Sequence, residues 1–115
     1  MGTAEGGVLL IGGDAETGRA ARDASAAAGL PFASAASLSD GLRMLAAGAR
    51  QATVLDVDLA EGDQALLERI AALPNAGALV LVAAAPSLRL AMDAARLGAA
   101  ELVAAPLTAE VLLRV

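Results

Sequence analysis

Short runs of Val, Leu and Ile alternate along the chain with longer alanine-rich stretches whose charged residues recur at helical spacing. Such a pattern is typical of strands that alternate with helices. It predicts five strands, at residues 8–12, 31–35, 52–56, 78–83 and 101–104. Because the run at 78–83 is apolar throughout, both faces of that strand must be covered, as in a parallel sheet between two helix layers. We therefore predict a doubly wound, five-stranded parallel α/β sheet.

Capping residues mark the ends of the first two predicted helices. Asp14 is suited to begin the first helix, and Gly29 to end it. Ser37 and Asp40 have the three-residue spacing of a capping box, which predicts the start of the second helix. Gly48 is expected to end that helix.

Two further helices and the start of a fifth complete the pattern. The third is predicted at 63–73 and the fourth at 87–97, where Gly98 ends it. The fifth begins after Thr108 and has barely two turns before Val115, too few to be stable on its own. We therefore expect the chain to be the amino-terminal part of a longer protein.

A chain of 115 residues has the size of one domain, and we assign residues 1–115 to a single domain with a flexible lead at 1–7. Hydrophobic residues make up 57% of it, but Phe32 is the one aromatic residue, so the bulk of the core must come from Leu, Val and Ile. The net charge of −5 and the scattered arginines argue against direct binding of nucleic acid.

The missing residue types narrow the possible functions further. The sequence contains no His, Cys or Lys, so the usual zinc ligands, nucleophile and base pairs, and Schiff-base lysines are lacking. We therefore expect no enzymatic activity and no catalytic residues. The lack of cysteine favours a reducing compartment, and no stretch has the length or the flanks of a membrane span or signal peptide, so we expect a cytoplasmic protein without membrane contact.

An aspartate ends the central predicted strand, at Asp56 in the sequence Val-Leu-Asp-Val-Asp-Leu. Together with Gly29 after the first helix, Leu-Gly-Ala around Gly98, and Ala105-Pro106 after the last strand, this order of marks resembles the receiver domains of bacterial response regulators. The resemblance spans residues 8–115. It implies a flavodoxin-like (βα)5 fold with strand order 2-1-3-4-5, a role in two-component phosphorelay signal transduction, and a cis peptide bond before Pro106.

At most of the positions where the family carries its phosphorylation machinery, this chain has other residues. The two acids that help to hold magnesium correspond to Gly12 and Gly13, and the hydroxyl residue of the fourth strand to Ala83. The conserved lysine of the family corresponds to Ala105, and its aromatic switch residue to Leu102. The resemblance therefore implies a degenerate site, or pseudo-receiver, in which no magnesium or other cofactor is expected.

Asp56 is thus the phosphoacceptor candidate, but we favour a retained carboxylate, because phosphoryl transfer depends on positioning and on neutralised charge. The leading hypothesis is an atypical receiver that acts through protein contacts without Mg²⁺-dependent phosphorylation. One alternative is a phosphorelay receiver that a histidine kinase phosphorylates on Asp56 with Mg²⁺. Asp14, Asp56 and Asp58 could instead form a different cation site, although solvated loop acids are the favoured interpretation.

Another alternative is a small-ligand sensor that uses the cleft at Gly12 and Gly13. Two glycines before a helix suit the close approach of an anion, but Asp14 places a negative charge where a phosphate would bind. Ala15 also stands where a dinucleotide fingerprint requires a second spaced glycine. Nucleotide binding is therefore disfavoured.

The fourth predicted helix has one narrow polar stripe, formed by Arg89, Asp93 and Arg96, and is otherwise apolar. It is either an alanine-rich helix with ordinary exposed apolar atoms or part of an interface. The interface hypothesis places Leu88, Met92 and Leu102 against a protein partner: a histidine kinase, an output domain or a second copy in a homodimer.

Overall fold

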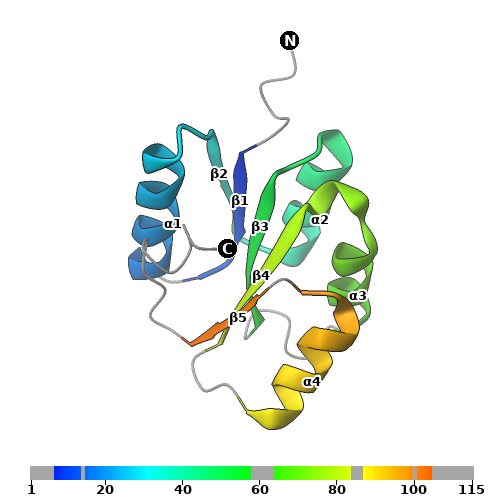
Figure 1. Cartoon of the computed structure of the whole chain (residues 1–115). Coiled ribbons are helices and arrows are strands. Elements are labelled where there is room, and N and C mark those ends of the chain that lie inside the picture. Colours follow the sequence, from blue (N-terminus) through cyan, green and yellow to red (C-terminus); the bar gives the residue numbers. More distant parts are fainter. Residues whose placement is uncertain (1–6, 14, 58–63, 84–86, 100, 105–115) are drawn as a thin grey trace.

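The computed structural model describes residues 7–13, 15–57, 64–83, 87–99 and 101–104. Its centre is one parallel sheet of five strands in the order β2-β1-β3-β4-β5 (Figure 1). The strands are β1 (Val8–Ile11), β2 (Phe32–Ala35), β3 (Ala52–Asp56), β4 (Ala78–Ala83) and β5 (Glu101–Ala104). The predicted doubly wound sheet and its order 2-1-3-4-5 are therefore confirmed, and three of the five strand ranges match in full.

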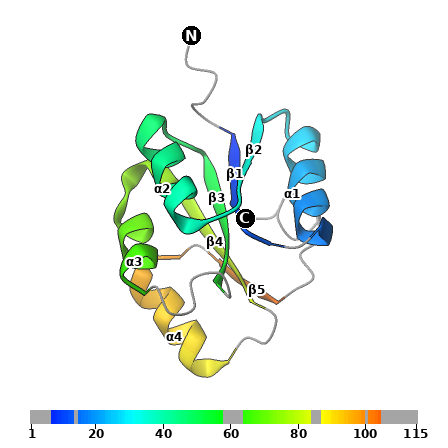
Figure 2. The same ribbon diagram turned by 180° about the vertical axis from the view of Figure 1, so that it is seen from behind.

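Helices cover both faces of this sheet (Figures 1 and 2). On one face lies α1 (Ala15–Ala27), and on the other lie α2 (Leu38–Ala47), α3 (Gln64–Ala72) and α4 (Leu88–Leu97). A short 3-10 turn, η2 (Pro74–Ala76), links α3 to β4. The helix ranges lie within about two residues of the predicted ones, as expected for helix ends that fray.

Alternate residues of β1 enter two separate hydrophobic clusters because successive strand side chains point to opposite faces. Leu10 packs in the cluster that contains Ala21 of α1, whereas Leu9 and Ile11 pack in the one that contains Leu45 of α2. All four β1 residues are buried. A strand covered on both faces cannot alternate with polar residues, which explains the continuous apolar runs in the sequence.

Serine side chains cap the starts of two helices by local hydrogen bonds. The Ser37 hydroxyl accepts a hydrogen bond of 3.1 Å from the backbone N–H of Asp40, which confirms the start of α2. Ser87 accepts an equivalent bond of 3.1 Å from Leu90 at the start of α4. Gly98 ends α4 in the left-handed conformation, with φ of 80°, which glycine adopts without strain.

Two predicted strand ends differ from the structure. β1 stops at Ile11 rather than Gly12, because Gly12 has φ of 77° and so leaves the extended conformation. β2 begins at Phe32, one residue after Pro31. Gly7, which we assigned to the lead, is buried, and its carbonyl accepts hydrogen bonds from the N–H groups of residues 51 and 52.

The Asp14 cap, the fifth helix and the peptide bond before Pro106 lie outside the described residues. Within the described part, none of the helices combines the length and the apolar composition that are needed to cross a membrane.

Candidate functional site

The carboxyl ends of the five strands meet at one edge of the sheet, because all the strands are parallel. In the register, Ile11 pairs with Leu55, and Asp56 pairs with Val82. Gly12 therefore follows β1 beside Asp56, the last residue of β3. The structure thus brings the phosphoacceptor candidate and the glycine pair together at this edge, as expected from their places in the sequence.

Asp56 is half-buried, whereas the two residues before it, Val54 and Leu55, are fully buried. Because these two side chains pack in opposite clusters, the end of β3 is held from both faces of the sheet. The backbone of Asp56 is therefore rigidly supported. Its carboxylate belongs to a fixed strand end, not to a free loop.

The loop after β1 has a backbone that suits glycine. Gly12 and Gly13 have φ of 77° and 87°, a region that residues with a side chain rarely adopt. The N–H of Gly12 donates a 2.8 Å hydrogen bond to the carbonyl of Ala35, which ties the loop to β2. A Cβ atom at Gly13 would lie 3.2 Å from Cγ2 of Thr17. An acid at Gly13 would therefore strain the backbone and crowd α1.

Ala83 ends β4 and is buried, and it pairs with Ala104 at the end of β5. Its methyl group offers no hydroxyl at this edge. Ala105, Pro106, Asp14 and Asp58 lie outside the described residues. Within the described residues, no group of three or more carboxylate, imidazole or thiol side chains is placed to hold a metal ion.

The interface candidates on α4 are largely exposed. Leu88 and Met92, one helical turn apart, are 78% and 64% exposed. Outside residues 64–67, no other large hydrophobic side chain in the described part of the chain is exposed. Leu102 differs, because it is half-buried and packs against the core cluster. On the polar stripe, Arg96 donates a 3.0 Å hydrogen bond to Asp93, as the spacing predicted.

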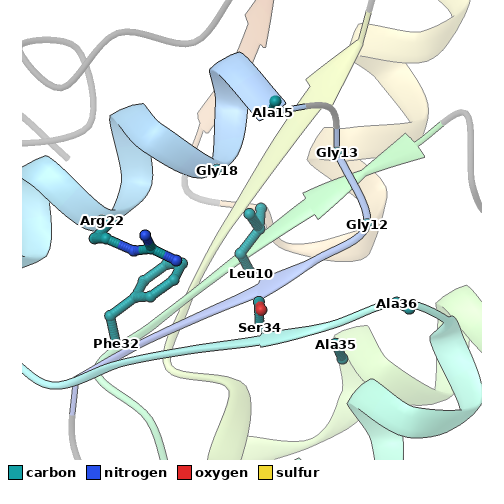
Figure 3. A pocket seen from close by; sticks show the side chains of 10 residues that line it. All are labelled: Leu10, Gly12, Gly13, Ala15, Gly18, Arg22, Phe32, Ser34, Ala35 and Ala36. Carbon is teal, nitrogen blue, oxygen red and sulfur yellow. The ribbon is translucent and has the colours of Figure 1, made fainter.

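A groove that the sequence indicated only in part lies between α1 and β2, with a volume of about 380 Å³ (Figure 3). Gly12 and Gly13 form one end of it, as the cleft hypothesis expected. Gly18, Arg22, Phe32 and Ser34 also line it, and none of them was predicted as a site residue. The one available signal was Gly18, a glycine inside a predicted helix.

Comparisons with known proteins give a result for structure but none for sequence. No protein-family model and no curated protein sequence matches this chain. A response regulator from Thermotoga maritima is similar in structure, with a TM-score of 0.81 and 19% identity, over 96% of this chain and 92% of the other. A CheY-like response regulator receiver domain from Methanospirillum hungatei JF-1 has a TM-score of 0.78 and 19% identity, over 96% and 88% of the two chains.

A third similar structure is a response regulator from Burkholderia pseudomallei, crystallised with a phosphorylated aspartic acid, a calcium ion and citrate. It has a TM-score of 0.76 and 23% identity, over 95% of this chain. The present chain spans 64% of the length of that protein. These likenesses show that the chain has the receiver fold of response regulators.

Proposed function

We propose that this chain is an atypical receiver domain, which takes part in two-component signalling through protein contacts and without Mg²⁺-dependent phosphorylation. The observation that carries this proposal is the edge of the sheet around Asp56. Among the described residues of this edge, the carboxylate of Asp56 stands beside two glycines, and the neighbouring strand ends in an alanine. The receiver fold and the absence of His, Cys and Lys from the chain support a non-enzymatic, cytoplasmic module.

The chemistry of magnesium supports a receiver that does not depend on Mg²⁺. Mg²⁺ requires several oxygen ligands in near-octahedral geometry and is usually held by more than one carboxylate or by substrate phosphates. Gly12 and Gly13 contribute no side-chain oxygen beside Asp56, and their left-handed backbone does not favour acids in their place. Asp56 with two glycines beside it is therefore a weak magnesium site.

The chemistry of phosphoryl transfer supports a receiver that is not phosphorylated on Asp56. Catalysis depends on positioning and on cations that neutralise the charge developing on the transferred oxygens. A phosphoryl group on Asp56 would lie near the buried methyl of Ala83 and could recruit no lysine, because the chain contains none. An acyl phosphate on Asp56 would therefore lack the cations that stabilise its formation and the lysine that would bind it.

The test is to incubate the protein with acetyl phosphate and Mg²⁺ and then to measure its intact mass. We expect no phosphoryl adduct. Asp56→Asn is the specific variant, and Asp40→Asn, a change at a carboxylate on α2, is the matched control. An adduct that persists in Asp40→Asn and disappears in Asp56→Asn would refute the proposal and favour the alternative, a phosphorelay receiver served by a histidine kinase.

We further propose that α4 provides the protein contact, with Leu88 and Met92 at its centre and Leu102 beside it, for a kinase, an output domain or a second copy. The exposure of the large apolar side chains of Leu88 and Met92, one turn apart on α4, supports this. Sedimentation of the wild type and of the double variant Leu88→Ser, Met92→Ser distinguishes the occupants. A concentration-dependent dimer that the variant abolishes supports a homodimer, whereas a monomer at high concentration excludes self-association.

A further inference from the structure

The groove between α1 and β2 has the size of a small-molecule site. Its volume of about 380 Å³ is within the range of ligand pockets, roughly 300–1,000 Å³. Leu10 contributes a branched apolar side chain to the lining. Ala35 also lines the groove, but its side chain packs in the core cluster on the other face of the sheet. Polar groups make up a comparable share of the lining: the guanidinium of Arg22, the hydroxyl of Ser34 and the backbone of the glycine loop (Figure 3). The lining is therefore mixed, and it offers both an apolar contact and convergent polar groups that could fix the orientation of a small molecule.

Gly18 keeps this groove open without being required by the packing of α1. A Cβ atom at Gly18 would meet only Cδ2 of Leu10, at 3.8 Å, which is an ordinary van der Waals contact. Alanine would therefore fit, and it stabilises a helix interior more than glycine does. The glycine leaves space in the groove that a larger side chain would occupy.

Arg22 is held at the other end of the groove by an aromatic ring. Its Cζ lies 5.5 Å from the centroid of Phe32, which is within the range of a cation–π contact. No ion pair of Arg22 with any other described residue is found. The planar guanidinium has the donor geometry that fits a carboxylate, and Ser34 directs its hydroxyl into the same groove (Figure 3).

The geometry points to a ligand with one carboxylate and a short apolar body. We propose that the carboxylate binds at Arg22 and Ser34, and that the apolar body lies along Leu10 and Gly18 towards the glycine loop. The opposite orientation is disfavoured, because Arg22, the charged residue of the lining, lies beside Phe32 and not at the glycine loop (Figure 3). This inference goes beyond the proposed function, since a domain that acts through protein contacts needs no small ligand.

Hexanoate is the probe, with hexan-1-ol as the body without the charge and inorganic phosphate as the charge without the body. Binding is followed by the backbone amide shifts of the ¹⁵N-labelled protein, at constant ionic strength because added anions also screen surface charge. We expect saturable shifts at Gly13, Gly18 and Ser34 with hexanoate, with a dissociation constant on the order of millimolar. Hexan-1-ol and phosphate should each bind at least several-fold more weakly.

Two substitutions test the two halves of the ligand. Arg22→Gln should weaken hexanoate binding about tenfold and remove its advantage over hexan-1-ol. Arg19→Gln, at another exposed arginine of α1 that does not line the groove, should leave the affinity unchanged. Gly18→Leu should fill the groove and abolish binding, whereas Ala26→Leu, on the exposed face of the same helix, should not.

Melting curves establish that each variant is folded, and Gly18→Ala provides a smaller change that α1 accommodates without crowding. Intermediate weakening in Gly18→Ala supports the inference. Three results would overturn it: no saturable shift with hexanoate, equal affinity for hexanoate and hexan-1-ol, or unchanged binding in Gly18→Leu.

Discussion

The same substitution, glycine to alanine, is expected to have opposite effects on stability at two helical positions. Gly18 in α1 has room for a methyl group, as described above. Gly41 in α2 does not: a Cβ atom there would lie 2.8 Å from Cγ1 of Ile11 and closer still to its Cδ1. Ile11 is fully buried at the end of β1, so its side chain has little freedom to move away.

The magnitudes follow from two competing contributions. Alanine in place of glycine stabilises a helix interior by about 1 kcal/mol. Overpacking a well-filled core costs roughly 1–3 kcal/mol. Gly18→Ala should therefore raise the free energy of unfolding by about 1 kcal/mol, and Gly41→Ala should lower it by about 1 kcal/mol, the difference between a cost near 2 and a gain near 1. The two variants should thus differ by about 2 kcal/mol.

Urea unfolding followed by circular dichroism measures both values, provided that the transition is two-state. A third variant isolates the contact. Ile11→Val removes Cδ1 and should cost roughly 0.5–1.5 kcal/mol alone, but less in the Gly41→Ala background, where it relieves crowding. If Gly41→Ala proves as stabilising as Gly18→Ala, or if the two changes at Gly41 and Ile11 are additive, then α2 does not pack on β1 as closely as described.

Two further predictions concern buried polar groups near the amino ends of β3 and β4. Thr53 is fully buried, and its hydroxyl donates a 2.7 Å hydrogen bond to the carbonyl of Ala76. Thr53→Val should therefore lower the unfolding free energy by about 1–2 kcal/mol, because that buried carbonyl loses its donor. An equal loss in Thr53→Ser, which keeps the hydroxyl, would show that the methyl group matters instead. Arg50 is 8% exposed, and its buried Nε has no hydrogen-bond partner within the described part of the chain. Arg50→Met removes this unsatisfied polar group and should therefore raise the unfolding free energy by about 1 kcal/mol. A lower unfolding free energy in the same urea assay would contradict this prediction.

The elements of this fold are readable from the sequence because their signals are local. A strand covered on both faces requires an apolar run, which is why β4 was predicted residue for residue. A serine that caps a helix accepts a hydrogen bond from the N–H three residues later, so the signal lies within four residues, as at Ser37 and Ser87. The end of β1 was misplaced by one residue because the pattern does not report the φ angle of Gly12. The strand order came from the resemblance, since a hydrophobic pattern contains no information on which strands are neighbours.

The candidate site divides in the same way. The place of Asp56 at the carboxyl edge follows from its position at the end of a strand, and the structure agrees. Only the glycine end of the groove beside α1 was predicted, because the volume of the groove depends on how α1 packs against β1 and β2. The sequence does not indicate that Arg22 lies against Phe32, the one aromatic residue. Their contact arises because α1 crosses β2 on one face of the sheet.

Gly12 and Gly13 belong to both candidate sites. Their lack of side chains leaves the edge around Asp56 without further side-chain oxygens at these positions, and it leaves one end of the groove open. Other residues belong to only one site. Asp56 does not line the groove, and Gly18 and Arg22 lie on α1, outside the edge formed by the strand ends. Asp56→Asn should therefore leave hexanoate binding unchanged, and Gly18→Leu should leave the resistance to acetyl phosphate unchanged. If either variant altered both measurements, the glycine loop would couple the two sites, and ligand binding in the groove would then be a means of controlling the edge at Asp56.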